Sequence, residues 1–252
     1  MQVPGGDFIA PLVTESLLDR LAMVTRRFDH ALVITPPGHP LVTAIGGHAA
    51  QVTRIDRVDA VVAADEPAHD LILWPAGLEV IDDVPGAVVQ ARRRLRADGL
   101  LMGGLVGDGS FALLRRLLAG EGMRAIPRMH PQIDLKTFGN LLQRTGFALP
   151  VCDVEANAVR YRDWRAIVAD LRAAGLAGQL ANPPPPLTRA ELAALDAGFA
   201  SVAAADRRAE EVLRIIYFTA WAPHPDQPRP AQRGSGKSSL AAALKAINPP
   251  DN

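Results

Sequence analysis

Residues 31–45 read Ala31-Leu-Val-Ile-Thr-Pro-Pro-Gly-His-Pro-Leu-Val-Thr-Ala-Ile45. The apolar run over residues 31–35 predicts a buried strand, and the Pro/Gly turn after it predicts a sharp break before a helix over residues 41–49. This succession is typical of the first strand of an α/β sheet, its loop and the next helix. In open α/β folds that loop is where a nucleotide-like ligand meets the protein. The composition of the loop therefore bears directly on what the fold can bind.

Length and composition limit the number of domains and the kinds of partner. The 252 residues, 48% of them hydrophobic, suffice for one large domain or two small ones with a buried core. Lys plus Arg and Asp plus Glu both number 27, so no net charge favours nucleic acid or an anionic membrane. We expect no nucleic-acid partner.

The cysteine content and the N-terminus bear on the compartment. A lone cysteine, Cys152, excludes an internal disulfide and suits a reducing compartment. We expect a buried thiol there rather than a nucleophile, because no basic activator stands beside it. The first residues lack a basic segment followed by an apolar one, and no segment approaches about 18 uninterrupted apolar residues. We therefore expect a soluble, cytoplasmic protein without a transmembrane segment.

The rest of the chain alternates strand-like and helix-like segments. We expect helices over residues 14–27, 41–49, 86–96, 111–118, 135–145, 161–174 and 188–205, and strands over residues 31–35, 51–55, 60–63, 70–74, 100–106, 147–160 and 215–221. Thr14 is the expected N-cap of the first helix, and Thr188 with Glu191 forms a capping-box pattern. Gly99 is expected to cap the end of the helix over residues 86–96. The alternation predicts a mostly parallel sheet with helices on both faces.

Two groups of residues carry a resemblance to a known family. Residues 70–104, with the turn Leu95-Arg-Ala-Asp-Gly-Leu100, resemble the region from strand four to strand five of class I S-adenosylmethionine methyltransferases. Residues 138–150, 215–221 and 224–235 resemble one subgroup. That subgroup contains the methyltransferase-like assembly factors of respiratory complex I and their bacterial relatives, which are similar to the malonyl-acyl-carrier-protein methyltransferase of biotin synthesis.

The resemblance implies a fold and two classes of function. The fold is α/β, a Rossmann-like, seven-stranded, mostly parallel sheet whose last strand is antiparallel, with a helical insertion over residues 161–205 between the last two strands. Residues 1–235 would form one domain and residues 236–252 a tail. The activity implied is S-adenosylmethionine-dependent methyl transfer to a small carboxylate or a protein side chain. The mitochondrial member of the subgroup is credited with arginine hydroxylation instead, so the family leaves the reaction open.

The loop after the first strand departs from the family pattern. Relatives carry acidic-x-Gly-x-Gly-x-Gly there, whereas residues 33–39 have an apolar residue at the acidic position and a single glycine. Pro36, Pro37 and Pro40 supply no N–H donors. The short interval from residue 31 to residue 70 also leaves no room for the helix that walls the adenine in the family. The candidate cofactor-binding residues are Thr35, Gly38, His39, Asp56 for the ribose and Trp74 for adenine stacking; the alternatives are a structural turn, an exposed turn aspartate and a core tryptophan.

Candidate catalytic residues come from later in the chain. Glu79-Val80 stands where relatives carry a His-Trp pair, and Asp82 and Asp83 are expected to cap the helix after Pro85. A histidine would serve as a general base or as an iron ligand, with an ordinary loop histidine as the alternative. No His-x-Asp/Glu triad is visible, so we expect no metal site. The candidate catalytic residues are His130, Tyr161, Tyr217 and His224.

One motif near the end of the chain suggests nucleotide binding. Residues 231–238 match a relaxed phosphate-binding loop, but a Pro-rich segment separates them from the preceding strand, so we expect a basic tail that can dock a partner.

The sequence leaves two hypotheses for the function. The chain is either an S-adenosylmethionine-dependent methyltransferase or a non-catalytic pseudoenzyme. The second would be an assembly factor or a module that binds a respiratory subunit or an acyl-carrier protein. The altered first loop and Glu79-Val80 favour the second.

Overall fold

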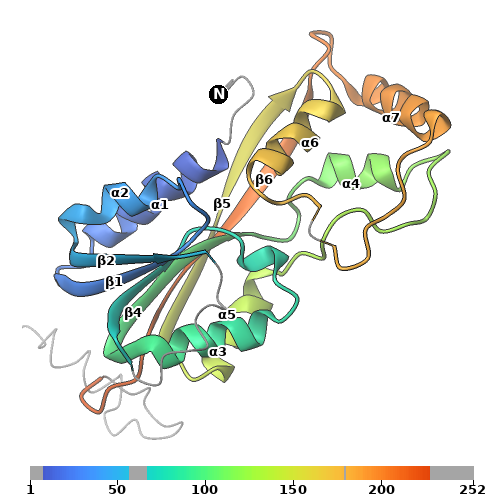
Figure 1. Ribbon diagram of the computed structural model, residues 1–252. Coiled ribbons are helices and arrows are strands. Elements are labelled where there is room, and N and C mark those ends of the chain that lie inside the picture. The colour runs from blue at the N-terminus through green and yellow to red at the C-terminus, as the bar shows by residue number, and fades with distance from the viewer. Residues whose placement is uncertain (1–7, 57–66, 179, 228–252) are drawn as a thin grey trace, which may run out of the picture.

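The computed structural model describes residues 8–56, 67–178 and 180–227, which contain one six-stranded sheet (Figure 1). The strands are β1 (Phe28–Ile34), β2 (Ala49–Ile55), β3 (His69–Trp74), β4 (Leu95–Val106), β5 (Ala148–Tyr161) and β6 (Ala209–Trp221), in the order β2-β1-β3-β4-β6-β5. Strands β1 to β4 are parallel, and β6 runs antiparallel to both β4 and β5. The mostly parallel sheet with an antiparallel last strand is confirmed. Seven strands were expected; the remaining one, over residues 60–63, lies outside the described residues.

Helices cover both faces and one end of the sheet. Helices α1 (Ile9–Ala22) and α2 (Leu41–Ala44) lie on one face, and α3 (Val84–Arg94) and α5 (Leu135–Arg144) lie on the other (Figure 1). Helices α4 (Ala112–Leu118), α6 (Trp164–Ala173) and α7 (Arg189–Val202) gather at the end of the sheet where β4 finishes. Because α6 and α7 come between β5 and β6, the predicted helical insertion is confirmed. Within the described ranges, no helix is both long and apolar enough to cross a membrane.

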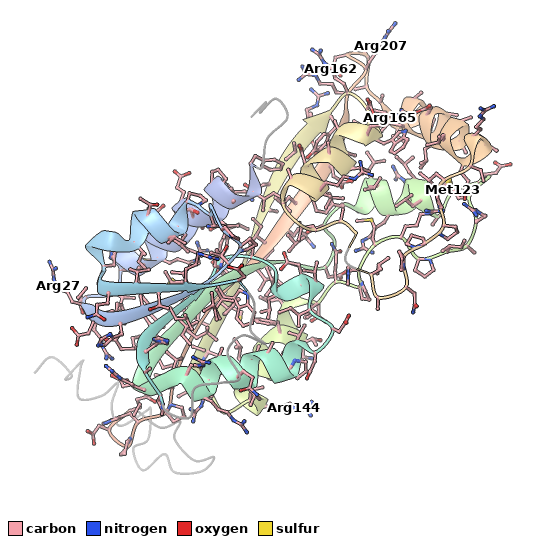
Figure 2. The ribbon with its side chains drawn as sticks, viewed as in Figure 1. Arg27, Met123, Arg144, Arg162, Arg165 and Arg207 are labelled. Carbon is pink, nitrogen blue, oxygen red and sulfur yellow. The ribbon has the colours of Figure 1, made fainter. Side chains whose placement is uncertain are left out.

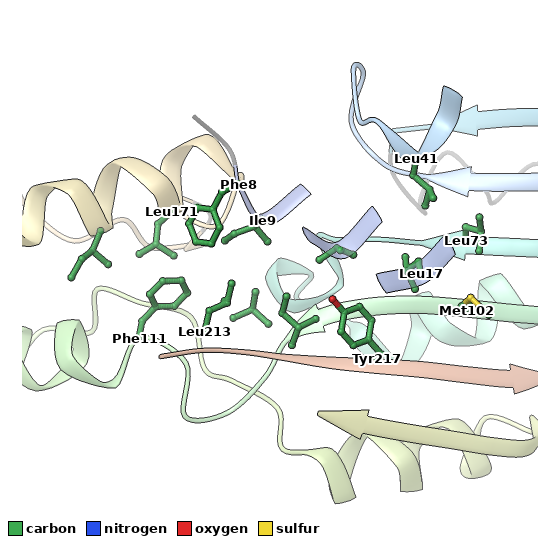
Figure 3. Packing of buried hydrophobic residues seen from close by; sticks show 14 of the residues in the cluster. Phe8, Ile9, Leu17, Leu41, Leu73, Met102, Phe111, Leu171, Leu213 and Tyr217 are labelled. Carbon is green, nitrogen blue, oxygen red and sulfur yellow. The ribbon is translucent and has the colours of Figure 1, made fainter. Parts of the chain in front are cut away.

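The core has two layers, one on each side of the sheet. Along β3, Leu71 and Leu73 join the α1 layer, while Ile72 and Trp74 join the α3 layer. A strand buried on both faces requires an uninterrupted apolar sequence, which is what residues 71–74 supply. The first layer continues past the sheet to Phe111 and to Leu171 of α6 (Figure 3). The insertion therefore shares the main core.

Local predictions that depend on near neighbours succeeded at helix starts. The carboxylate of Asp83 accepts a hydrogen bond from the backbone N–H of Gly86 at 2.9 Å, so the predicted cap of α3 is confirmed. The capping box of Thr188 and Glu191 is also present at the start of α7.

Three local predictions were wrong. Helix α1 begins at Ile9, and Thr14 is a buried residue inside it, whose hydroxyl donates to the carbonyl of Ala10 at 2.8 Å. Gly99 is not a helix cap, because α3 passes directly into β4 and the left-handed residue is Asp98, with φ 61°. The helix predicted over residues 41–49 is α2 plus the short 3-10 helix η1 (Ile45–Gly47), since β2 already begins at residue 49.

Candidate functional site

Two groups at the loop after β1 are already hydrogen-bonded within the chain. Thr35 is buried, and its N–H donates to the carbonyl of Ile55 at 2.9 Å. The Nδ1 of His39 accepts from the N–H of Leu41 at 3.3 Å. Gly38 takes the left-handed conformation, with φ 84°, which glycine adopts at little cost. Helix α2, which follows, has only four residues, so it offers a ligand little of the usual helix N-terminus.

A cation spans the carboxyl ends of β1 and β2. The guanidinium of Arg54 donates to the carbonyl of Thr35 at 3.0 Å and also pairs with the carboxylate of Asp56. Asp56 is the residue predicted to hold the ribose hydroxyls, and its charge is already compensated. A carboxylate that already accepts from a guanidinium has fewer free acceptor positions for the hydroxyls of a ribose. The described residues at this edge therefore do not fit the family's usual way of holding the cofactor.

Trp74, the residue predicted to stack on adenine, is packed in the core. Its side chain is 2% exposed and belongs to the α3 layer. Its backbone pairs with Gly103 of β4. No broad ring face is left for a ligand at this position, so Trp74 is a core residue and not a platform for adenine.

A pocket of about 320 Å³ lies at the carboxyl ends of β3 and β4. None of the predicted cofactor-binding residues lines it. Its apolar walls come from α4 and α6, through Leu114, Leu118, Val168 and Leu171. Its polar groups come from separate segments of the chain, and they are Glu79, Arg115, Arg128, His130, Gln132 and Arg172.

Glu79 ties the end of β3 to the end of β4. It lies in the 3-10 helix η3 (Leu78–Val80), after Gly77 in the left-handed conformation with φ 91°. One carboxylate oxygen accepts from the N–H of Gly77 at 3.0 Å and the other from the N–H of Val106 at 3.2 Å. Burial raises the pKa of Glu79, and these backbone donors oppose the rise. At the position where the resemblance implies a His-Trp pair, this chain places a half-buried acid.

Two arginines bring positive charge to the pocket. Arg115 on α4 donates from one terminal nitrogen to the carbonyl of His130 at 2.7 Å, and burial lowers its pKa. Arg128 donates from Nη1 to the carbonyl of Pro185 at 2.9 Å. In the part of the chain that the structure describes, four buried nitrogens here have no hydrogen-bond partner: Nε of Arg115, Nε and Nη2 of Arg128, and Nε2 of His130. Buried donors normally have a partner, so these groups stand out.

The pocket arginines differ from those on the outside of the molecule. Figure 2 shows Arg162, Arg165 and Arg207 at the end of the molecule that carries α6. Arg165 donates to the carboxylate of Asp196 at 2.6 Å in an exposed pair. Such surface pairs contribute little to stability, and their donors are already satisfied or solvated.

One buried carboxylate fastens the loop before α5 to the proline-rich linker. Glu191 is 2% exposed and accepts from Nε and Nη2 of Arg124 at 2.8 and 2.7 Å. These bonds, together with the N–H of Thr188, hold the pKa of Glu191 well below its ordinary value. Arg124 also donates to the carbonyl of Pro186 at 2.7 Å. One side of the pocket is therefore held in place by arginine contacts to proline carbonyls.

Of the four candidate catalytic residues, His130 alone lines the pocket. Tyr161 is buried, and its hydroxyl donates to the carboxylate of Asp170 at 2.9 Å. Tyr217 lies in the α1 layer near Leu17 (Figure 3), and burial raises its pKa to about 12. His224 follows β6, whose residue Trp221 pairs with Leu100 near the start of β4. His224 therefore lies at the opposite end of the sheet from the pocket.

Arg115 and Arg128 were not predicted as site residues. Glu79 was visible as a departure from the family pattern at a strand end, but the two arginines stand in a helix and a loop with no motif around them. Within the described ranges, no group of three or more His, Cys, Asp or Glu side chains is arranged to hold a metal ion.

No family model matches the chain. It is 30% identical over 186 residues to the arginine-hydroxylase NDUFAF5, mitochondrial, of Danio rerio, covering 71% of this chain and 58% of that protein. It is 27% identical over 157 residues to the malonyl-[acyl-carrier protein] O-methyltransferase of Gallionella capsiferriformans, covering 62% and 53%. The chain thus spans about half the length of the relatives it matches.

Solved structures show the same fold. A candidate methyltransferase of Bacillus halodurans superposes with a TM-score of 0.56 at 14% identity, over 84% of this chain and 99% of that one. This likeness concerns the fold alone.

Proposed function

We propose that this chain, a member of the class I methyltransferase-like superfamily, is a binding module that retains the fold without the standard cofactor site. The observation that carries the proposal is the position of Arg54, which contacts both the carbonyl of Thr35 and the carboxylate of Asp56. In this fold those two strand ends are the expected place for the methionine and ribose parts of the cofactor.

The neighbouring residues support the same conclusion. Pro36 and Pro37 have no N–H to offer a ligand carboxylate, and their φ angles are fixed. The N–H of Thr35 is already donated to Ile55. Backbone donors and conformational freedom are what a glycine-rich cofactor loop supplies, so this loop lacks both means of holding the ligand.

We propose a protein partner for the module, either a respiratory-chain subunit or an acyl-carrier protein. One matched relative is named for hydroxylating arginine and another for methylating a malonyl group on an acyl-carrier protein. Both names describe action on a group that belongs to or is carried by another protein. The cytoplasmic location stays a prediction, since the first relative is named as mitochondrial.

A second candidate function is methyl transfer to a small carboxylate or a protein side chain. The observation that favours it is the pocket at the carboxyl ends of β3 and β4, which lies on the same edge of the sheet as the loop after β1. His130 lines that pocket and would serve as the general base for an acceptor that must lose a proton.

A titration of the full chain with S-adenosylmethionine and S-adenosylhomocysteine separates the two functions. Low-micromolar binding would stabilise the fold by about 2.7 kcal/mol at about 100 times the dissociation constant. For the wild-type chain we expect neither binding heat nor a thermal shift. Saturable low-micromolar binding overturns the proposal and supports the methyltransferase.

Variants test whether Pro36, Pro37 and Arg54 prevent cofactor binding. We expect a triple variant, Pro36→Gly with Pro37→Gly and Arg54→Ala, to gain affinity for S-adenosylhomocysteine. The matched control is Arg93→Ala, an exposed arginine of α3 far from this edge. If the triple variant stays as inert as the control, these three residues are not what prevents binding.

A further inference from the structure

We propose that the pocket at the ends of β3 and β4 binds an apolar monocarboxylate, whose carboxylate Arg115 and Arg128 hold. This inference goes beyond the binding-module proposal, because the pocket shares no residue with the edge where Arg54 lies. It applies whether or not the chain binds a cofactor.

Two arginines that line the pocket have buried donors without a hydrogen-bond partner in the described parts of the chain. Nε of Arg115 and both Nε and Nη2 of Arg128 are buried without a hydrogen-bond partner among the described residues. Guanidinium groups pair with carboxylates through planar, charge-assisted hydrogen bonds. Both arginines line the pocket, and a turn of each guanidinium toward the cavity would bring these nitrogens to an anion there, which would supply the missing acceptors.

The charged groups around the pocket favour the binding of one anion. The Nη2 of Arg128 lies 3.8 Å from Glu191, but that carboxylate already accepts three hydrogen bonds from Arg124. Asp108 influences Arg115 only through its charge. Arg172 adds another cation to the lining. Positive charge therefore predominates on the side where the donors are unsatisfied.

Glu79 limits the ligand to a single acidic group. Its carboxyl lines the pocket at the strand ends and is fixed there by the N–H groups of Gly77 and Val106. A second carboxylate on the ligand would lie beside this acid in a poorly solvated space, where neither the acid nor a nearby cation among the described residues compensates its charge and its desolvation is costly. A monocarboxylate avoids that contact.

The walls specify the rest of the ligand. Leu114 and Leu118 of α4 and Val168 and Leu171 of α6 present aliphatic surface to the pocket. A volume of about 320 Å³ is at the small end of the range for ligand sites. A short alkyl chain suits this shape, with its carboxylate at the arginines.

Calorimetry on the full chain with three eight-carbon probes tests the proposal. Octanoate carries one carboxylate, octanamide carries none, and suberate carries two. We expect octanoate to bind at one site per chain, and both other probes to bind at least about tenfold more weakly. No saturable octanoate binding, or equal binding of octanoate and octanamide, overturns the proposal. Equal binding of suberate overturns the limit set by Glu79.

Variants of Arg115 and Arg128 test whether these side chains hold the carboxylate. Arg128→Gln and Arg115→Gln should each weaken octanoate binding by about tenfold or more. The matched control is Arg116→Gln, the exposed neighbour of Arg115 on α4, which should bind octanoate as the wild type does. If octanoate affinity is unchanged in both pocket variants, the arginines do not hold the carboxylate. Should a pocket variant fail to fold, the probe comparison on the wild-type chain still decides the proposal. The cofactor titration reports on the other site, so either proposal can fail alone.

Discussion

Replacing Gly103 with alanine should strongly destabilise the protein. A Cβ at this position of β4 would lie 2.4 Å from the carbonyl oxygen of Trp74 and 2.5 Å from Cζ of Phe218. The first contact is with backbone in the adjacent strand, so a side-chain rotation cannot relieve it. The second would push Phe218 against Phe138, whose ring centroid is already 4.8 Å away. Overpacking typically costs about 1–3 kcal/mol, and we expect the upper end, about 3 kcal/mol.

Urea unfolding followed by circular dichroism measures this cost. A loss of about 3 kcal/mol corresponds to a fall in Tm of roughly 6–12 °C for a chain of this size. Gly46→Ala is the control, because no heavy atom lies within 4 Å of its added Cβ, and we expect a change within about 0.5 kcal/mol. If Gly103→Ala unfolds at the same urea concentration as wild type with the same slope, β3, β4 and β6 do not approach as closely as described.

Two further predictions concern titratable groups. The pKa of Glu191 in the folded chain is held below its ordinary value by Arg124 and Thr188, so its stabilising contribution is present above the ordinary value of 4.5 and is lost as the pH falls through the folded-state pKa. Between about pH 6 and pH 3, urea unfolding should therefore show a smaller loss of stability in Glu191→Gln than in wild type, and equal losses would contradict the assignment. Burial and the nearby Asp153 raise the pKa of Cys152 to about 11, so at about pH 8 only roughly a thousandth of the thiol is ionised. Cys152 should react with iodoacetamide far more slowly than free cysteine at that pH and faster as the pH rises, whereas a rate equal to that of free cysteine would show an unburied thiol.

The sequence predicted those parts of the fold that depend on local patterns. The apolar run at residues 71–74 and the antiparallel ending could be predicted because burial and strand-helix alternation leave direct marks in the chain. The Asp83 cap and the Thr188–Glu191 box were predictable for the same reason, since each joins residues three positions apart. Thr14 failed as a cap because a threonine inside a helix can donate to its own backbone, an arrangement that the sequence does not distinguish from a cap.

The candidate site could be predicted only in part, because most of it is assembled from distant segments. Glu79 was recognisable from its place at the end of a strand. Arg115 and Arg128 become pocket residues only when α4, the loop before α5 and the helical insertion meet. The contact of Arg54 with Thr35 depends likewise on the register between two strands.

The direction of β6 explains why His224 lies away from the pocket. An antiparallel last strand ends where its parallel neighbours begin. A residue after β6 therefore lies beside the start of β4, where Gln227 donates to the carboxylate of Asp98 at 2.8 Å. The predicted direction of the strand was sufficient to place His224 away from the cleft.

The pairing of Tyr161 with Ala209 means that the insertion leaves and rejoins the sheet at a single point. A segment attached in this way can be lengthened, shortened or exchanged in evolution without shifting the register of any strand. Helix α6 supplies Val168, Leu171 and Arg172 to the pocket, whereas Val106 belongs to β4 and Glu79 to η3, which follows β3. Mutations in the insertion can therefore change which ligand the pocket prefers, while the strand ends where Arg54 lies stay unchanged.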